Sequence, residues 1–72
     1  MKGNPKKNVR MKASRALKGL SQEELAKAVG VTRQTIGMIE AGDYNPSLNL
    51  CIAICRTLDQ TLDGLFWNEE KT

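Results

Sequence analysis

The chain has 72 residues, two cysteines and no histidine, and its formal net charge is +3. A chain of this length forms one domain at most and buries only about 60% of the surface that it exposes when unfolded, so it is marginally stable alone. Two cysteines are too few for a disulfide-rich secreted scaffold, and neither a transmembrane run of about 18 apolar residues nor a signal-peptide segment is seen, so we expect a cytoplasmic protein with no membrane partner.

Residues 1–8 are interpreted as a basic N-terminal arm, which Gly3 and Pro5 make irregular. Residues 1–20 hold seven basic residues and no acidic one, whereas residues 43–72 hold two basic and five acidic residues. A basic end is typical of a protein with a polyanionic partner. A solvated lysine-rich tail explains the same charges equally well.

Five short helices are predicted within a domain that spans residues 9–67, followed by a polar tail at residues 68–72. The first helix runs from about Asn8 to Lys18 and stops at Gly19. The connections between the helices are tight, and there is no internal repeat.

The second and third helices have the clearest boundaries. Ser21 and Glu24 match a capping box at the start of the second helix. Gly30 ends that helix because glycine adopts the left-handed conformation at no steric cost. Thr32 is then the candidate N-cap of the third helix, which runs to about Ala41.

The last two helices follow a loop at Asn45 and Pro46, where the proline disfavours helix at the residue before it. Ser47 caps the fourth helix and Thr61 caps a short fifth one. No segment is a convincing strand, although residues 65–67 could pair with the tail as a short one. The predicted fold class is therefore all-α, with five short helices and at most a short terminal strand.

Residues 22–41 carry a motif that is typical of a helix-turn-helix. Two helices cross steeply when a small residue lies where they touch, a left-handed residue lies in the turn, and apolar residues lie between them. Ala26 and Gly30 meet the first two needs. Five apolar residues meet the third: Leu25, Val29, Val31, Ile36 and Ile39. Because all these residue types agree over a short segment, the motif is a strong signal.

The third helix is predicted to have one face for the core and one for a ligand. At about 100° per residue, Ile36, Ile39 and Glu40 share the inner face. The outer face holds Arg33, Gln34, Gly37, Met38 and Ala41. The second helix of such a motif enters the DNA major groove, and Gly37 would remove side-chain bulk where that helix lies close to the bases. An ordinary solvated face is the alternative.

The outer side chains suit the edges of base pairs. Arg33 can bond guanine O6 and N7 as a fork, and Gln34 can bond adenine in the same way. Thr32 and Thr35 can reach phosphates or a thymine methyl group, and Met38 can contact a thymine methyl group.

The start of the second helix offers a site for a phosphate. Its free N–H groups and its dipole attract an anion, and the side chain of Gln22 can add a hydrogen bond. The reading in which Ser21 and Glu24 only cap the helix is equally good. Glu23 and Glu24 would repel a phosphate that came too close.

The sequence resembles the Cro and phage-repressor type of helix-turn-helix, the large Xre-like family. The segments GLSQEELAKAVGVTRQTIGMIEAG, YNPSL and LDGLFW carry the likeness, and together they cover about residues 11–67. The resemblance implies a lambda-repressor-like fold and a double-stranded DNA partner. The DNA-contacting residues that it implies are Gln22, Thr32, Arg33, Gln34, Thr35, Gly37, Met38, Tyr44 and Asn45.

Within that set the resemblance makes Arg33 and Gln34 the main base readers, and it places Tyr44 and Asn45 on backbone phosphates. It also implies structural roles for Ala26, Gly30, Arg15 and Glu40, the last two as an ion pair. Such a pair is also expected physically, because an acidic group on an inner helix face needs a partner. The alternative is that both side chains extend into water.

The first helix departs from the family pattern. Members usually carry a large aliphatic residue at the position of Ser14, whereas here the apolar residues are Val9, Ala13, Ala16, Leu17 and Leu20. Either this helix is rotated, or Leu17 is exposed and available to a partner. Gly37 replaces a side chain with which many relatives contact bases, and this bears on the preferred sequence.

Cys51 and Cys55 lie four residues apart on one helix and therefore face the same way. Two thiolates supply half a zinc site, and no histidine or further cysteine completes it, so we expect no metal and no cofactor. Packing as small buried residues is expected instead. A zinc site shared by two subunits and a redox switch are the weaker alternatives.

Four apolar residues are assigned to a homodimer interface: Leu17, Ile52, Phe66 and Trp67. A dimer would cover this surface, stabilise a small core, and present two recognition helices to half-sites about 34 Å apart. The alternative is that Trp67 folds back on its own domain.

The sequence therefore predicts a sequence-specific DNA-binding transcriptional regulator, a repressor that acts as a homodimer on a two-fold symmetric operator. No catalytic constellation is seen, so we do not expect an enzyme. Two alternatives stay open. The chain could be an antitoxin with a toxin as a second partner, or a protein-interaction module that kept the fold and lost DNA binding.

Overall fold

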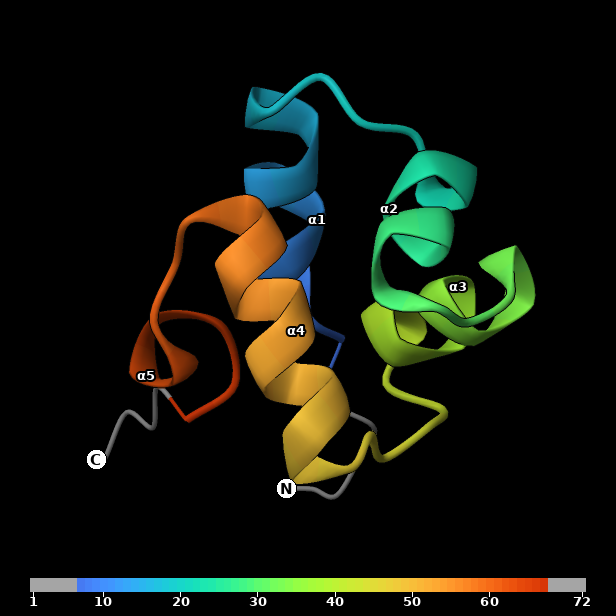
Figure 1. The fold of residues 1–72 in the computed structure, drawn as a ribbon. Coiled ribbons are helices and arrows are strands. Elements are labelled where there is room, and N and C mark those ends of the chain that lie inside the picture. Colours follow the sequence, from blue (N-terminus) through green and yellow to red (C-terminus); the bar gives the residue numbers. More distant parts are fainter. Residues whose placement is uncertain (1–6, 68–72) are drawn as a thin grey trace.

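The structure is a computed structural model, and it describes residues 7–67. Five helices follow one another along the described chain (Figure 1): α1 (Val9–Leu17), α2 (Gln22–Val29), α3 (Arg33–Ala41), α4 (Leu48–Leu58) and α5 (Leu62–Leu65). The predicted all-α class with five helices is confirmed. Residues 7–67 contain no strand. The short strand considered at residues 65–67 is not formed in this range, since Leu65 is the last residue of α5 and Phe66 is its C-cap. Most of the predicted arm and the whole predicted tail lie outside the described residues, so those boundaries stay predictions.

Local side-chain hydrogen bonds set the helix boundaries where the sequence places them. Ser21 Oγ accepts the N–H of Glu24 at 3.0 Å, and Glu24 Oε1 accepts the N–H of Ser21 at 2.8 Å, which completes the capping box. Gly30 ends α2 with a φ of +82°. Thr32 opens α3 by accepting the N–H of Thr35 at 3.2 Å. Serine and threonine caps also open α4 and α5, as predicted.

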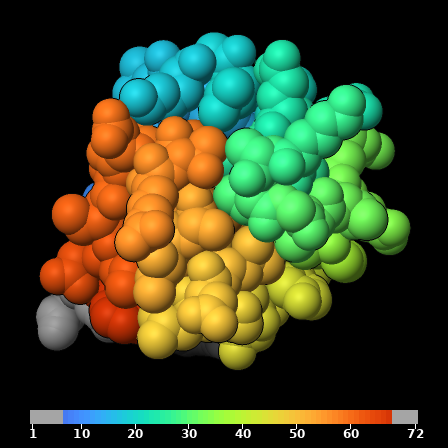
Figure 2. Space-filling model, in the orientation of Figure 1, coloured from blue at the N-terminus to red at the C-terminus, as the bar shows by residue number. Residues whose placement is uncertain are grey.

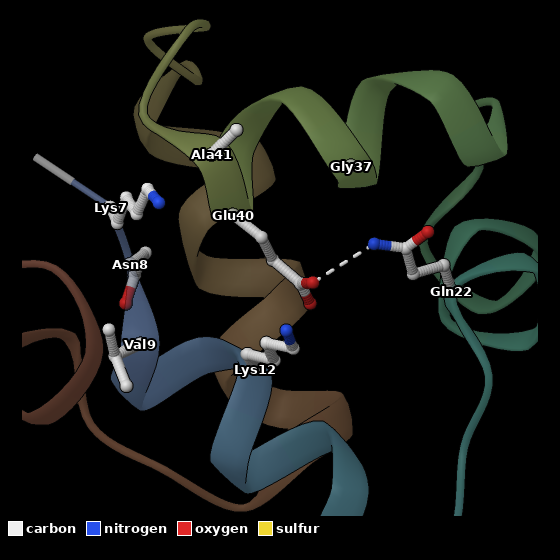
Figure 3. A pocket seen from close by; sticks show the side chains of 8 residues that line it. All are labelled: Lys7, Asn8, Val9, Lys12, Gln22, Gly37, Glu40 and Ala41. Carbon is white, nitrogen blue, oxygen red and sulfur yellow. Dashed lines mark hydrogen bonds between the residues drawn. The ribbon is translucent and has the colours of Figure 1, made fainter. Parts of the chain in front are cut away.

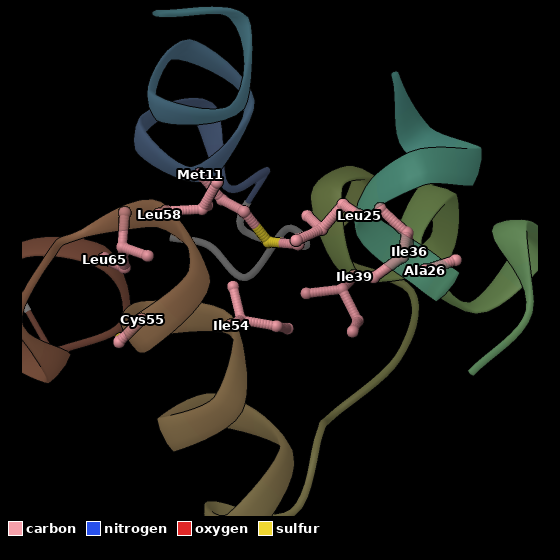
Figure 4. Packing of buried hydrophobic residues seen from close by; sticks show 9 residues of the cluster. All are labelled: Met11, Leu25, Ala26, Ile36, Ile39, Ile54, Cys55, Leu58 and Leu65. Carbon is pink, nitrogen blue, oxygen red and sulfur yellow. The ribbon is translucent and has the colours of Figure 1, made fainter. Parts of the chain in front are cut away.

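The apolar core lies between the helices, and all five contribute to it (Figure 4). Its buried members are Met11, Leu25, Ala26, Ile36, Ile39, Ile54, Cys55, Leu58 and Leu65. The helix-turn-helix contacts expected from the sequence are therefore present, with Val29 and Val31 packed against the same cluster. In Figure 1, α2 and α3 lie on one side of α4 and α5 lies on the other.

Of the two alternatives left open for α1, a rotated helix or an exposed Leu17, the structure shows an exposed Leu17. The only buried residue of α1 is Met11, which is fully shielded from solvent. The apolar residues that the sequence analysis noted on this helix are exposed: Val9, Ala13, Ala16 and Leu17. Arg15 lies near Met11 on the inner side and is held there by Glu40. The ion pair stabilises this orientation of α1 more than burial of the small side chains of Ala13 and Ala16 would stabilise another one. In this orientation Leu17 is 86% exposed.

Both cysteines are buried on α4, where they are free thiols. Burial raises the pKa of the Cys51 and Cys55 thiols, and the charge of Cys51 raises the pKa of Cys55 further. Neutral thiols suit packing as small apolar groups, which is the predicted role. Within residues 7–67 no three potential metal-ligating side chains lie together. No helix in this range has the length and apolar character to cross a membrane.

Candidate nucleic-acid interface

The two faces of α3 differ in burial as the helical period predicts. Ile36, Ile39 and Glu40 are buried, with 0%, 3% and 7% of their surface exposed. The outer-face residues all keep access to solvent: Arg33, Gln34, Gly37, Met38 and Ala41. Figure 2 shows the side chains of α2 and α3 at the margin of the molecule opposite α5. Arg33 and Gln34, in the first turn of α3, are the most accessible of these residues to a ligand.

Buried Glu40 is paired with Arg15, as expected. Arg15 Nε donates to Glu40 Oε2 at 2.8 Å and Arg15 Nη2 donates to Oε1 at 3.2 Å. The two side chains are only 13% and 5% exposed. Arg15 Nη1 also donates to the carbonyl of Leu20 at 2.9 Å. A fork of this kind fixes the relative position of α1 and α3 more tightly than a single contact does.

The hydrogen bonds continue from Glu40 to the first turn of α3 through Gln22. Gln22 Nε2 donates to Glu40 Oε1 at 3.0 Å, and Arg33 Nη1 donates to Gln22 Oε1 at 3.3 Å. We call Arg15, Glu40, Gln22 and Arg33 the polar network. A phosphate or base-edge contact of Gln22 was expected from the sequence, and its bond to Arg33 was not. One of the two protons on Gln22 Nε2 stays available to an anion.

The two threonines at the start of α3 interact with each other. Thr32 Oγ1 serves as the N-cap, and the hydroxyls of Thr32 and Thr35 lie 3.0 Å apart. Tyr44 and Asn45 lie in the loop between α3 and α4, where both are exposed. This loop follows the C-terminal end of α3, whereas Thr32, Arg33 and Thr35 lie at its N-terminal end. All of the DNA contacts proposed from the sequence remain predictions, and none of these side chains is buried.

A cavity of about 350 Å³ opens beside α3, between the starts of α1 and α2 (Figure 3). Its lining residues are Lys7, Asn8, Val9, Lys12, Gln22, Gly37, Glu40 and Ala41. The N–H of Asn8 donates to the carbonyl of Glu40 at 2.8 Å, so the end of the arm is attached to the end of α3. Two exposed lysines, Lys7 and Lys12, therefore lie next to α3.

Lys12 is a candidate contact to the phosphate backbone of DNA, and the sequence alone did not indicate it. Its position depends on the orientation of α1, which the sequence pattern left open. The signal available was charge alone, since α1 carries three basic residues and no acidic one: Arg10, Lys12 and Arg15. Of these three, Arg15 is used internally and Lys12 lines the cavity.

Gly37 faces the start of α2 and the cavity. A Cβ placed on it would lie 3.7 Å from Gln22 Nε2. This distance is ordinary van der Waals contact, so an alanine side chain would also fit beside the Gln22 amide.

The residues assigned to a dimer interface do not all share one surface. The helix α1, which ends at Leu17, has its end at the top of Figure 1, whereas α5, which precedes Trp67, lies at the lower left. Trp67 is 58% exposed, so it is not folded into its own domain. Phe66 is half-buried and packs against the core, and Ile52 is half-buried on α4. Trp67 and Leu17 are thus the two large apolar side chains of this group that water reaches most fully.

The chain is similar to known helix-turn-helix proteins. Residues 11–65 match the family model described as helix-turn-helix. The HTH-type transcriptional regulator YgzD of Bacillus subtilis is 48% identical over 62 residues, which cover 86% of this chain and 94% of that protein. An HTH-type transcriptional regulator of Archaeoglobus fulgidus is 49% identical over 57 residues, or 79% of this chain and 81% of that protein. The crystal structure of the restriction-modification controller protein C.AhdI from Aeromonas hydrophila matches with a TM-score of 0.76 and 37% identity, covering 82% of this chain and 89% of that one.

Proposed function

This chain belongs to the helix-turn-helix family of Cro and phage-repressor type, DNA-binding regulators of transcription, and we propose that it is a repressor that binds a two-fold symmetric operator as a homodimer. The observation that carries this proposal is the first turn of α3, where Arg33 and Gln34 are exposed. Both are side chains that read base edges in the major groove. The family consists of regulators rather than enzymes.

Direct readout is assigned to the start of α3. Arg33 has five N–H donors, and one of them is bonded to Gln22. The remaining donors form the fork that matches guanine O6 and N7. Gln34 and Met38 would read the neighbouring base pairs, the first by hydrogen bonds and the second by contact with a thymine methyl group.

Backbone contacts are assigned to both flanks of α3. On the cavity side, Lys7 and Lys12 supply positive charge, and the N-terminus of α2 supplies free N–H groups. On the other side, Tyr44 and Asn45 extend from the loop. Contacts of this kind set the position of the helix on the duplex and carry no sequence information by themselves.

Arg33→Ala is expected to weaken binding to a guanine-containing operator by about 1–3 kcal/mol, because the bidentate contact to one base is lost. Lys7→Ala is expected to weaken binding to all sequences alike and to lower the salt dependence, because one phosphate contact is lost. Arg56→Ala is the matched control, since it removes an exposed positive charge from the last turn of α4. Titrations at several salt concentrations measure all three. If Arg33→Ala and Lys7→Ala both bind like the parent, readout by this helix is wrong.

The homodimer is assigned to the surface around Trp67, which pairs two copies of the same patch. The exposed indole is the kind of large apolar group that a subunit interface covers. Trp67→Ser is expected to shift a dimer toward the monomer at micromolar concentration, whereas Leu17→Ser, on a different surface, leaves the equilibrium unchanged. Sedimentation equilibrium measures this. A parent protein that stays monomeric at such concentrations contradicts the assignment.

A further inference from the structure

We propose that α1 carries a docking surface for an amphipathic helix of another protein, one whose apolar stripe lies between acidic residues. The surface is the side of α1 that faces away from the core, and we call it the outer face. Its residues are all exposed: Val9, Arg10, Lys12, Ala13, Ala16 and Leu17. This role is separate from the proposed binding to DNA and does not depend on it.

The apolar residues of α1 point into water and not into the core. The helix buries Met11 alone (Figure 4), whereas Val9 is 65% exposed and Leu17 is 86% exposed. At about 100° per residue, Val9 and Leu17 fall with Ala13 and Ala16 within one arc of about 100° around the helix axis. An arc of this width is the stripe by which a surface helix normally packs on a neighbour. Here the stripe has no neighbour within residues 7–67.

Basic residues border this stripe on both sides. Around the helix axis, Arg10 lies beyond Leu17 at one edge and Lys12 lies beyond Ala16 at the other. The helix itself supplies no acidic residue to balance them. Complementary charge across an interface favours association and fixes its register. The partner is therefore expected to carry Asp or Glu on both sides of its apolar residues.

The shape of the outer face suits a helix. Ala13 and Ala16 lie between Val9 and Leu17, whose Cα atoms are about 12 Å apart along the axis. Packed helices have axes about 8–10 Å apart, at a distance set by the side chains at the contact. The two alanines allow an approach at the short end of this range. Val9 and Leu17 can then insert between side chains of the partner on either side of the crossing point.

Three other occupants fit the outer face less well. In a pair of α1 helices from two copies of this chain, the basic residues at the edges would face one another, which is repulsive. A helix that lies on a membrane has a broad apolar face with Trp, Phe or Leu, and here Leu17 and Val9 are the only large apolar residues. The DNA backbone would use the charges of Arg10 and Lys12 and leave Leu17 in water. An acidic amphipathic helix uses the charges and the apolar stripe together.

The test begins with selection from a phage-displayed library of random peptides on the full-length chain. Peptides of about 18 residues are long enough to form a helix, and such a helix is about 27 Å long. We expect the enriched peptides to share apolar residues three and four positions apart, with Asp or Glu on both sides of them. Circular dichroism of the enriched synthetic peptide should show that it gains helix when it binds.

Substitutions on the outer face then test each of its features with that labelled peptide, by fluorescence anisotropy. Leu17→Ser should weaken binding about tenfold or more, because the burial of a leucine is lost. Arg10→Gln should weaken it about twofold to fivefold at low salt and have no effect at high salt. Ala13→Gln keeps a good helix former but adds bulk, so it should also weaken binding. Trp67→Ser and Lys27→Gln change exposed residues elsewhere and should leave the affinity unchanged.

Circular dichroism of each variant checks that the fold is kept, since all the substituted residues are exposed. The proposal is overturned if no peptide is enriched, or if the enriched peptides bind Leu17→Ser as tightly as the parent. A loss with Arg10→Gln alone would show a general attraction of acidic peptides and no docked helix. Self-association of the parent that Leu17→Ser abolishes would assign the outer face to a second copy. Binding to phosphatidylserine vesicles that Leu17→Ser abolishes would assign it to a membrane.

Discussion

We expect Glu40→Ala to lower the free energy of unfolding by about 3–5 kcal/mol, because it leaves the buried Arg15 guanidinium without its carboxylate. Arg15 keeps its bond to the carbonyl of Leu20 but loses both bonds to Glu40. Gln22 Nε2 loses its acceptor as well. A domain of this length has about 4–11 kcal/mol in total, so this one change removes a large share of it. Urea denaturation followed by circular dichroism measures the difference.

The double variant Arg15→Met with Glu40→Leu separates the cost of an unpaired charge from the value of the pair. Apolar side chains of similar volume often replace a buried ion pair with little change in stability. We therefore expect the double variant to be much more stable than Glu40→Ala. A loss below about 1 kcal/mol in Glu40→Ala would match an exposed ion pair and would contradict the burial of this one.

Met11→Ala is expected to cost about 2–5 kcal/mol, as deletion of a large side chain from a packed core does. Met11 is fully buried and lies among side chains from several helices (Figure 4). Leu17→Ala on the same helix is the matched control, and it should change stability by less than about 0.5 kcal/mol because its side chain is in water. Thermal and urea unfolding of the two variants measure both values. The reverse order of effects would mean that α1 is rotated, which is the other alternative that the sequence left open.

The helix boundaries could be predicted because they depend on neighbouring residues. Ser21, Thr32 and Gly30 act through hydrogen bonds and backbone conformations within a few positions of themselves. The division of α3 into an inner and an outer face follows from the helical period alone. These features need no knowledge of the rest of the fold.

The rotation of α1 could not be predicted because its apolar pattern is ambiguous. Ala13 and Ala16 have little apolar surface, so the free energy changes little whether they lie in the core or in water. The choice is made by a long-range pair, Arg15 with Glu40, and by a methionine that fills the space beside it. In the observed orientation of α1, Lys12 lines the cavity. Its role could not be predicted because this orientation was left open.

The candidate site was predictable as a set of residue types and positions, but not as a network. The motif places Gln22 and Arg33 at the starts of two helices, and the structure brings their side chains together. The sequence does not show which side-chain atoms meet there. That depends on rotamers and on the depth of Glu40, which only the packed structure shows.

The most direct test of readout by α3 is selection of bound duplexes from a random pool, performed in parallel with the parent protein and with Arg33→Ala. We expect the parent to select a two-fold symmetric consensus with a guanine in each half-site. Arg33→Ala should lose the preference at that position and keep the preferences elsewhere in the half-site. Identical consensus sequences from the two proteins would contradict the assignment of Arg33, and no consensus from the parent would contradict sequence-specific binding altogether.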